Sequence, residues 1–288
     1  MNYHQPVLAP EIIKYFDPKA GQIYIDVTLG NGGHTIEILK KGAFVYGLDA
    51  DPLNLKIATD RIKDLGLSQN FHPLKGNFNR LLAIWKKEIN QPLDGILADL
   101  GLSLNQQSGQ ERGFSFNDTS SLDMRLNSKT QNITAEEIIN TWDKDQLYQI
   151  FTKYTQEKLA KPLIYEIIQA RQVRPIKSGT QLSQIINSYY QKKHYSTYHQ
   201  PATKIFLALR IAVNHEFENL NNLLSATQKI TKSGGKIAII SFHSGEDRLV
   251  KQFIQKNNYS SRKILPNHSE VKKNPLSRSA LLRLYNLN

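Results

Sequence analysis

The chain has 288 residues, of which 40% are hydrophobic, and a net charge of +12 at pH 7. This length and apolar content allow one large domain or two unequal ones, with a sizeable core. Cysteine is absent, which excludes a disulfide framework and a thiolate metal site. No apolar run approaches the length of a membrane span, and the N-terminal residues show no apolar signal region. We therefore expect a protein of the cytoplasm.

The positive charge is concentrated in two parts of the sequence. Residues 1–150 carry 15 Lys and Arg against 18 Asp and Glu. By contrast, residues 158–210 carry 9 Lys and Arg against 1 Asp or Glu, and residues 251–288 carry 8 basic residues against 1 acidic residue. This concentration favours a surface that binds a polyanion, nucleic acid above all. A lysine-rich surface that serves only solubility is the alternative.

The first hundred residues alternate strands with helices. Short apolar strands are expected at 22–30, 43–51 and 92–101, with a weaker one near 70–74. Helical spacing of apolar residues is found at 35–42 and 52–65. The alternation predicts an α/β fold with a mainly parallel sheet covered by helices.

After residue 104 this alternation is interrupted. Only helices are expected over roughly 134–141, 143–153, 156–172 and 180–193, followed by a long helix over 202–230. A strand over 234–244, a helix over 245–257 and a final strand over 279–287 then resume the first pattern. We therefore predict one α/β domain made of residues 1–104 and 203–288, interrupted by an inserted helical domain of residues 105–202.

The segment DVTLGNGGHT, residues 26–35, places three glycines between the first strand and the first helix. Such a turn lets backbone N–H groups approach a ligand, and the helix N-terminus favours negative charge. A dinucleotide fingerprint would need a glycine where the chain has Thr35, and the Gly-Lys-Ser/Thr of a P-loop is missing. The turn therefore indicates an adenosine-type ligand, and a tight turn whose glycines serve only packing is the alternative.

Three carboxylates are expected at one edge of the sheet, because Asp26, Asp49 and Asp99 each end a predicted strand. At the end of the second strand, Asp49 can accept hydrogen bonds from both hydroxyls of a ribose. Three carboxylates would repel a phosphate, but they suit hydroxyls, an amino group and a sulfonium. S-adenosylmethionine combines these groups. An Asp49 that merely caps the following helix is the alternative.

Motifs along the whole chain resemble those of one known family. They are HQPVL (4–8), DVTLGNGGHT (26–35), LDAD (48–51), DGILADLGLS (94–103), ERGFSF (111–116), LDMR (122–125), SFHSGEDR (241–248) and NPLSRSALLR (274–283). Their order and spacing are similar to those of the bacterial 16S ribosomal RNA cytosine-N4 methyltransferases, the RsmH or MraW family. The resemblance runs from about residue 4 to residue 284, and the ERGFSF, LDMR and SFHS-EDR motifs are the most specific.

The resemblance implies a class I S-adenosylmethionine-dependent methyltransferase, a Rossmann-like α/β fold, with an all-helical insertion that binds substrate. It implies N4-methylation of a specific cytidine of 16S rRNA in the decoding region of the small ribosomal subunit. No membrane partner is expected, and a homodimer stays open. The cofactor-binding residues that it implies are Gly32, Gly33, His34, Asp49, Phe78, Asp99 and Gln106.

The amine of cytosine is a poor nucleophile, because its lone pair is delocalised into the ring. An enzyme must hold it in line with the methyl donor and accept hydrogen bonds from it. Asp99 and Ser103 are the expected acceptors, and His243 is expected to face the target base or its phosphate. A His243 that only holds its loop is the alternative. A hydrolase triad of Ser241, His243 and Asp247 is disfavoured, because the G-x-S-x-G elbow is missing.

RNA binding is expected from both parts of the chain, by Arg112, Arg125, Lys192, Lys193, Tyr195 and Arg278. Residues 189–199, YYQKKHYSTYH, interleave aromatic rings with cations, which suits unpaired RNA. Packing of these rings within the insertion is the alternative. Arg112 and Arg125 either contact RNA or order their own loop. The eight histidines show no metal-ligand spacing, so no metal site is expected.

Three segments depart from the family pattern. Leu104 and Asn105 stand where a serine and a proline are usual, Gly245 replaces a leucine, and YTQE (154–157) replaces YGEE. These departures concern the substrate pocket more than the cofactor site. The altered loop LSLNQ (102–106) keeps open a ribosome-assembly factor that binds RNA and cofactor without turnover. A DNA amino-methyltransferase is the other alternative, disfavoured because its proline-proline loop is missing.

Overall fold

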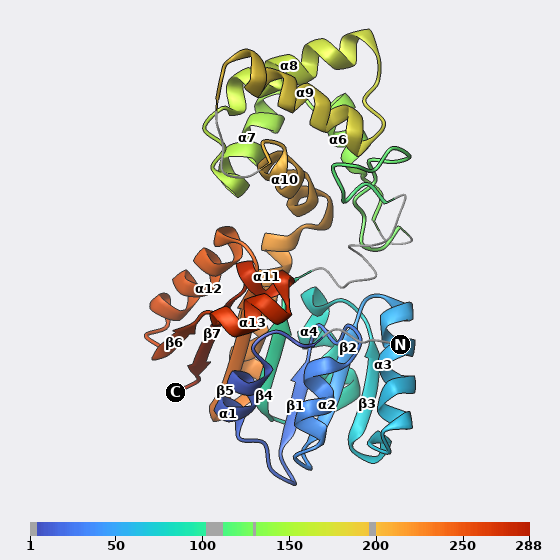
Figure 1. Ribbon diagram of the computed structural model, residues 1–288. Helices are drawn as coiled ribbons and strands as arrows, with labels where there is room; N and C mark the ends of the chain where they lie inside the picture. Colours follow the sequence, from blue (N-terminus) through green and yellow to red (C-terminus); the bar gives the residue numbers. More distant parts are fainter. Residues whose placement is uncertain (1–4, 102–111, 129–130, 196–199) are drawn as a thin grey trace. The chain divides into compact units, whose positions relative to one another are not determined.

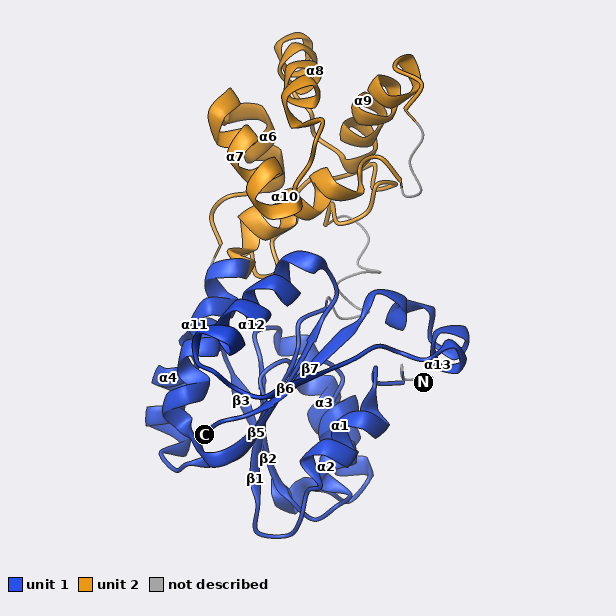
Figure 2. Ribbon diagram, turned by 90° about the vertical axis from the view of Figure 1, so that its left-hand side faces the viewer, with its two compact units in different colours: residues 1–103, 217–288 blue, residues 104–216 orange. Residues whose placement is uncertain are grey.

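A computed structural model describes residues 5–101, 112–128, 131–195 and 200–288 (Figure 1). The chain forms two compact units, which Figure 2 shows in separate colours. Unit 1 consists of residues 1–103 and 217–288, and unit 2 of residues 104–216.

Unit 1 is built on a seven-stranded sheet with the order β3-β2-β1-β4-β5-β7-β6. The strands are β1 (Ile23–Asp26), β2 (Phe44–Asp49), β3 (Phe71–Lys75), β4 (Leu93–Asp99), β5 (Thr231–Ser241), β6 (Ser261–Ile264) and β7 (Leu281–Asn286). Every pairing from β3 to β5 is parallel, and β7 is antiparallel to both of its neighbours. The predicted α/β, Rossmann-like class with a mainly parallel sheet is confirmed.

Helices cover both faces of this sheet. On one face α1 (Ala9–Phe16), α2 (Gly33–Leu39) and α3 (Pro52–Asp64) bury Phe16, Ile38 and Ile62 against the strands. On the other face lie α4 (Leu81–Ile84), the π-helical turn Trp85–Ile89, α11 (Glu216–Ile230) and α12 (Ser244–Lys256). Leu81 and Leu223 are fully buried there. A parallel sheet covered on both faces explains why its strands read as continuous apolar runs.

Short elements complete unit 1. They are the single turns Ser68–Asn70, Phe78–Arg80 and Pro275–Ser279, and helix α13 (His268–Lys273). Helix α3 shows how the sequence sets a boundary. Asp51 accepts a hydrogen bond from the backbone N–H of Leu53 at 2.9 Å, and Pro52 occupies the first helical position.

Unit 2 is all-helical and has its own core. It contains α6 (Ala135–Thr141), α7 (Lys144–Thr155), α8 (Ala160–Val173), α9 (Gly179–Lys192) and α10 (Thr203–Asn214). Its core includes Phe151, Ile164 and Leu209, each with no exposed surface. Since the two units bury separate sets of apolar residues, each has an independent source of stability.

The second boundary of the insertion differs from the sequence expectation of 202/203. The structure divides the chain at 216/217, because Ile205 and Leu209 of α10 join the core of unit 2 and α10 packs against α7. The single long helix expected over 202–230 is wrong. It is split at His215, whose left-handed φ of 52° ends α10.

Strand β6 was not expected from the sequence, because its residues SRKI are mostly polar and mostly exposed. Among the helices that the structure describes, none has the length and apolar character needed to cross a membrane.

Candidate active site

The carboxyl ends of β2, β1, β4 and β5 lie side by side at one edge of the sheet. The register pairs Asp26 at the end of β1 with Gly47 of β2 and with Leu97 of β4. Asp99, which ends β4, pairs with Ile240 of β5. The expected arrangement of three carboxylates on adjacent strand ends is therefore present.

The glycine-rich turn between β1 and α2 needs glycine for its backbone conformation. Gly30 and Gly32 have φ values of 52° and 78°, in the left-handed region. Gly32 is also closely packed, since a Cβ there would lie 3.2 Å from the Cβ of Ala58 on α3. A Cβ on Gly33 would lie 3.1 Å from the Cβ of Pro6. The packing alternative therefore accounts for part of this motif.

Asp26 holds the start of α2. Its carboxylate accepts hydrogen bonds from the Oγ1 of Thr35 at 2.8 Å and from the backbone N–H of Thr28 at 3.1 Å. Burial raises the pKa of Asp26, against the effect of these bonds and of His34. From the sequence, Thr35 served only to exclude a dinucleotide fingerprint, and its link to Asp26 was not predicted. The available signal was the spacing of these two residues, since Thr35 follows nine residues after Asp26, the acid that ends the strand.

Asp49 connects the turn to β2. Its carboxylate accepts hydrogen bonds from the backbone N–H groups of Gly30 and Asp51, both at 2.8 Å, and from the side chain of Asn54 at 3.4 Å. Burial raises the pKa of Asp49 to about 6, although these hydrogen bonds act in the opposite direction. The cap of α3 is provided by Asp51, so capping by Asp49 is not what the structure shows. Ribose binding by Asp49 stays a prediction.

Asp99 and His34 face each other at the centre of this edge. The Nε2 of His34 lies 3.6 Å from the Oδ2 of Asp99, and the backbone N–H of Asp99 donates to the Oγ1 of Thr28 at 2.6 Å. The Nε2 of His34, the Oδ1 of Asp99 and the Oδ1 of Asn31 are buried, and none has a hydrogen-bond partner among the described residues. Buried polar atoms without partners are rare in proteins and costly. His34 and Asp99 face each other, so the Nε2 of His34 and the Oδ1 of Asp99 can serve a ligand with hydrogen-bond donors and acceptors.

Phe78 is placed at the same edge by the turn that follows β3. The side chain of Asn77 accepts a hydrogen bond from the backbone N–H of Asn79 at 3.0 Å and so begins this turn. Phe78 is half-buried and packs against the core on the α11 side of the sheet. Part of its surface stays exposed, and the cofactor binding that the resemblance implies for Phe78 stays a prediction.

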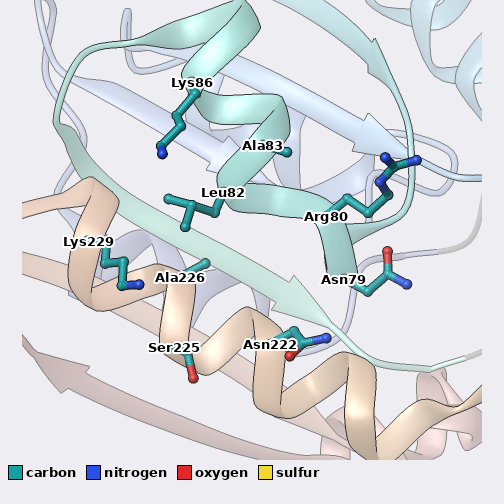
Figure 3. Close-up of a pocket in the computed structure, with 9 residues that line it drawn as sticks. All are labelled: Asn79, Arg80, Leu82, Ala83, Lys86, Asn222, Ser225, Ala226 and Lys229. Carbon is teal, nitrogen blue, oxygen red and sulfur yellow. The ribbon is translucent and has the colours of Figure 1, made fainter.

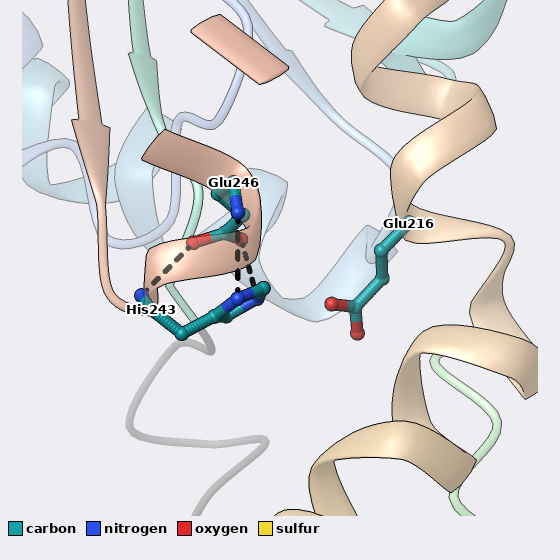
Figure 4. Close-up of side chains that lie close together, drawn as sticks. All are labelled: Glu216, His243 and Glu246. Carbon is teal, nitrogen blue, oxygen red and sulfur yellow. Dashed lines mark hydrogen bonds and ion pairs between the residues drawn. The ribbon is translucent and has the colours of Figure 1, made fainter. Parts of the chain in front are cut away.

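His243 begins α12 and holds the loop after β5 (Figure 4). Its Nδ1 accepts from the backbone N–H of Glu246, and the Glu246 carboxylate accepts from the backbone N–H of Phe242 at 2.9 Å. The Nε2 of His243 also lies 3.4 Å from the Oε1 of Glu246. These contacts agree with the loop-holding alternative, and contact with a target base stays a prediction. Glu216, also drawn in Figure 4, is paired with Arg210 at 2.7 Å.

Phe217 fills the space beside His243 that a larger residue at position 245 would need. The two rings are stacked, with centroids 6.0 Å apart and planes inclined by 28°. A Cβ on Gly245 would lie only 2.5 Å from the Cζ of Phe217. The departure from the family pattern at Gly245 is therefore matched by this ring, which the sequence analysis did not identify.

The hydrolase triad finds no support in the contacts of Asp247. Its carboxylate pairs with the guanidinium of Arg283 on β7, with one hydrogen bond of 3.1 Å. Ser241 is buried, and its Oγ has no hydrogen-bond partner among the residues described. An Asp247 held by Arg283 does not orient His243, which a triad requires.

In unit 2, Arg112 and Arg125 order their own loop. The guanidinium of Arg112 donates to the carbonyl oxygens of Arg125 and Leu126 at 2.7 and 2.9 Å. Arg125 makes a two-pronged contact with Asp123, with both bonds at 2.7 Å, and donates to the carbonyl of Gln131. Of the two roles considered for these arginines, the structure therefore supports the loop-ordering one. RNA contact by either residue stays a prediction.

The tyrosine-rich end of α9 combines packing with exposure. Tyr189 and Tyr190 are buried in the core of unit 2, as the packing alternative requires. Tyr195 is 49% exposed and lies against both rings, and Lys192 and Lys193 are exposed beside it. In unit 1, Arg278 is exposed in the turn before β7. Ser103 and Gln106, together with the departures at 104 and 105, lie outside the described residues.

Comparison with known proteins gives a consistent match over the whole chain. The model of the MraW methylase family matches residues 1–287. A Synechococcus protein named ribosomal RNA small subunit methyltransferase H is 39% identical, over 98% of this chain and 91% of that protein. A Hydrogenobaculum protein of the same name is also 39% identical, over 97% of this chain and 94% of that protein. A solved rRNA methylase from Streptococcus thermophilus aligns over 100% of both chains, at 11% identity and a TM-score of 0.48.

The raised pKa of Asp49 predicts a pH dependence of stability. Its folded pKa of about 6 lies above the ordinary value of 3.8. Its contribution is therefore fully present below about pH 4 and is lost as the pH rises through 6. Relative to wild type, Asp49→Asn should gain about 2–3 kcal/mol of unfolding free energy between pH 4 and 7. Denaturant unfolding of both proteins across this range measures the difference. The exposed Asp64→Asn is the matched control. If the difference in unfolding free energy between Asp49→Asn and wild type stays as constant across this pH range as the difference for Asp64→Asn, the prediction is contradicted.

The contact between Phe217 and Gly245 predicts coupled substitutions. Gly245→Leu should destabilise unit 1 by about 1–3 kcal/mol, because the new side chain overlaps the Phe217 ring. In the double variant with Phe217→Ala, the leucine can occupy the vacated space. A double-mutant cycle of unfolding free energies should then give a coupling of about 0.5–3 kcal/mol in favour of the double variant. Additive effects would show that the ring and the glycine are independent.

Proposed function

The chain belongs to the MraW methylase family, and from this membership we propose that it transfers a methyl group from S-adenosylmethionine to RNA of the small ribosomal subunit. The accepting atom is the N4 amine of a cytidine, in the decoding region of 16S rRNA, and the enzyme works in the cytoplasm. Two relatives at 39% identity bear the name ribosomal RNA small subunit methyltransferase H. The observation that carries the proposal is the facing pair His34 and Asp99, in which the buried Nε2 of His34 and Oδ1 of Asp99 have no hydrogen-bond partner among the described residues.

The described residues fit S-adenosylmethionine. The glycine turn presents backbone at the N-terminus of α2, and Asp49 stands at the end of the next strand for the ribose hydroxyls. Phe78 offers an apolar face to the adenine. The Oδ1 of Asp99 can accept a hydrogen bond from an amine, and the carboxylates favour a cationic ligand. When bound, S-adenosylmethionine supplies a methyl group on a positively charged sulfur.

Within this proposal Asp99 has the central chemical role. A hydrogen bond from the cytosine amine to its carboxylate would localise the nitrogen lone pair and direct it toward the methyl group. As the nitrogen–carbon bond forms, the carbon–sulfur bond breaks and the sulfur becomes neutral. The amine then releases one proton, which the carboxylate or water can accept. Ser103 is proposed as a second acceptor, and His243 keeps the loop after β5 in place.

The substrate would be held by exposed groups of unit 2. Lys192 and Lys193 offer charge to phosphates, and Tyr195 offers a ring on which an unpaired base can stack. Its position against two buried tyrosines limits its freedom, which reduces the entropy lost on stacking. We propose that these residues contact rRNA next to the target cytidine.

The methyl transfer is tested with labelled S-adenosylmethionine offered separately to three substrates. These are small ribosomal subunits lacking the modification, naked 16S rRNA, and DNA. Label is expected at the N4 position of a cytidine in rRNA, located by nuclease digestion and mass spectrometry. Label in DNA alone would reject the proposal. Cofactor binding without transfer to any substrate would instead favour an assembly factor that keeps the pocket without turnover.

Cofactor binding has a sharper test at Asp49. Asp49→Ala removes the proposed ribose acceptor and the partner of Gly30, so affinity for S-adenosylmethionine should fall by at least about tenfold. Calorimetric titration measures this, and circular dichroism checks that the fold is kept. S-adenosylhomocysteine should lose affinity by a similar factor, because it carries the same ribose. Unchanged affinity for both ligands would show that Asp49 does not contact the ribose.

A further inference from the structure

A groove of unit 1 lies between the segment after β3 and helix α11, and none of the three strand-end carboxylates lines it (Figure 3). It has a volume of about 480 Å³. One wall comes from the segment after β3 and the other from α11. The lining residues are Asn79, Arg80, Leu82, Ala83, Lys86, Asn222, Ser225, Ala226 and Lys229.

The groove is positively charged and has no compensating acid. Arg80, Lys86 and Lys229 line it, and no Asp or Glu does. All three side chains are exposed, and in the described part of the chain none of them forms an ion pair with a carboxylate. By contrast, the neighbouring Lys87 is paired with Glu88 at 2.8 Å. Three unpaired cations around one concavity favour an anionic ligand that extends along it.

The remaining lining residues narrow the chemistry of that ligand. Leu82, Ala83 and Ala226 contribute apolar surface, while Asn79, Asn222 and Ser225 contribute amide and hydroxyl groups. An RNA strand presents all the matching features, namely phosphates, 2′-hydroxyl groups and the apolar edges of its sugars. A simple inorganic anion would leave the apolar surface of Leu82, Ala83 and Ala226 unused.

The position of the groove connects it to the candidate active site. Asn79 and Arg80 directly follow Phe78, at the carboxyl end of β3. From there the wall continues through α4 and the turn Trp85–Ile89 toward the start of β4. On the opposite wall, α11 leads to the start of β5, and Lys229 lies in its last turn. The groove therefore extends from the carboxyl edge of the sheet toward the opposite edge.

We propose that this groove binds the sugar-phosphate backbone of rRNA that continues from the target nucleotide. The identity of the RNA rests on the proposed function, whereas the charge and shape of the groove do not. Counting charges along the sequence did not reveal this surface, because its cations lie outside both basic stretches. Arg80 and Lys86 belong to residues 1–150, which are net acidic, and Lys229 is more than a hundred residues away.

The test compares two double variants with equal loss of charge. Lys86→Gln with Lys229→Gln alters the groove, and Lys14→Gln with Lys63→Gln removes two exposed cations of α1 and α3 on the other face of the sheet. Binding of each protein to in vitro transcribed 16S rRNA and to unmodified small subunits is measured at salt concentrations from about 0.05 to 0.3 M. In this range counterion release dominates the salt dependence of RNA affinity. Affinity for S-adenosylmethionine is measured on the same preparations, to verify that both variants are folded.

The groove variant should reduce the slope of log affinity against log salt by about 1.4–1.8, since each lost phosphate contact removes about 0.7–0.9. At about 0.1 M salt this corresponds to roughly 25- to 60-fold weaker RNA binding. The control variant should keep the wild-type slope. Equal slopes for the groove variant and wild type would overturn the proposal. The proposal would also be overturned if polyglutamate displaced bound RNA as effectively as unlabelled RNA does, because the groove would then fit an acidic protein.

These outcomes are separate from those that test methyl transfer. RNA binding is measured without turnover, so a protein that transfers no methyl group can still show the expected change in slope. In that case the proposed function fails and the groove proposal stands. If instead the wild-type protein methylates rRNA and the groove variant binds RNA as wild type does, the proposed function stands and the groove proposal fails.

Discussion

Hydrogen bonds between the glycine-rich turn and the strand-end aspartates fix the backbone around which the candidate site is arranged. Gly30 donates to Asp49 of β2, Thr35 donates to Asp26 of β1, and Thr28 accepts from the backbone of Asp99 on β4. One turn is thereby tied to three adjacent strands. Each tie involves a buried or half-buried donor, so the loss of any acceptor would leave an unsatisfied polar group as well as a looser turn.

The same carboxylates create an electrostatic cost that a suitable ligand would reduce. Burial raises the pKa values of Asp26 and Asp49, which means that burial disfavours their ionised forms. A ligand that carries positive charge and hydroxyl donors would stabilise those ionised forms. This coupling gives a physical reason why a cationic adenosine derivative suits the site better than a phosphate ester, independently of any family resemblance.

The sequence was most informative where a pattern was local. Continuous apolar runs predicted β1, β2, β4 and β5, and the acids that end three of them predicted one functional edge. Contacts between distant residues could not be predicted in this way. The split at His215 depends on packing of α10 in unit 2, and the fit of Phe217 to Gly245 joins residues 28 positions apart. Arg112 and Arg125 looked like RNA ligands because their loop contacts are formed only in the fold.

The insertion of unit 2 between β4 and β5 has a consequence for how the chain folds. These two strands pair at the centre of the sheet, yet roughly 130 residues separate the end of one from the start of the other. Closing a flexible loop of that length carries an entropic cost that grows with the logarithm of its length. Unit 2 has a core of its own, built from contacts within one continuous segment. If that segment folds first, the connection between β4 and β5 contains far fewer flexible residues, and unit 2 thereby assists the closure of the central sheet of unit 1.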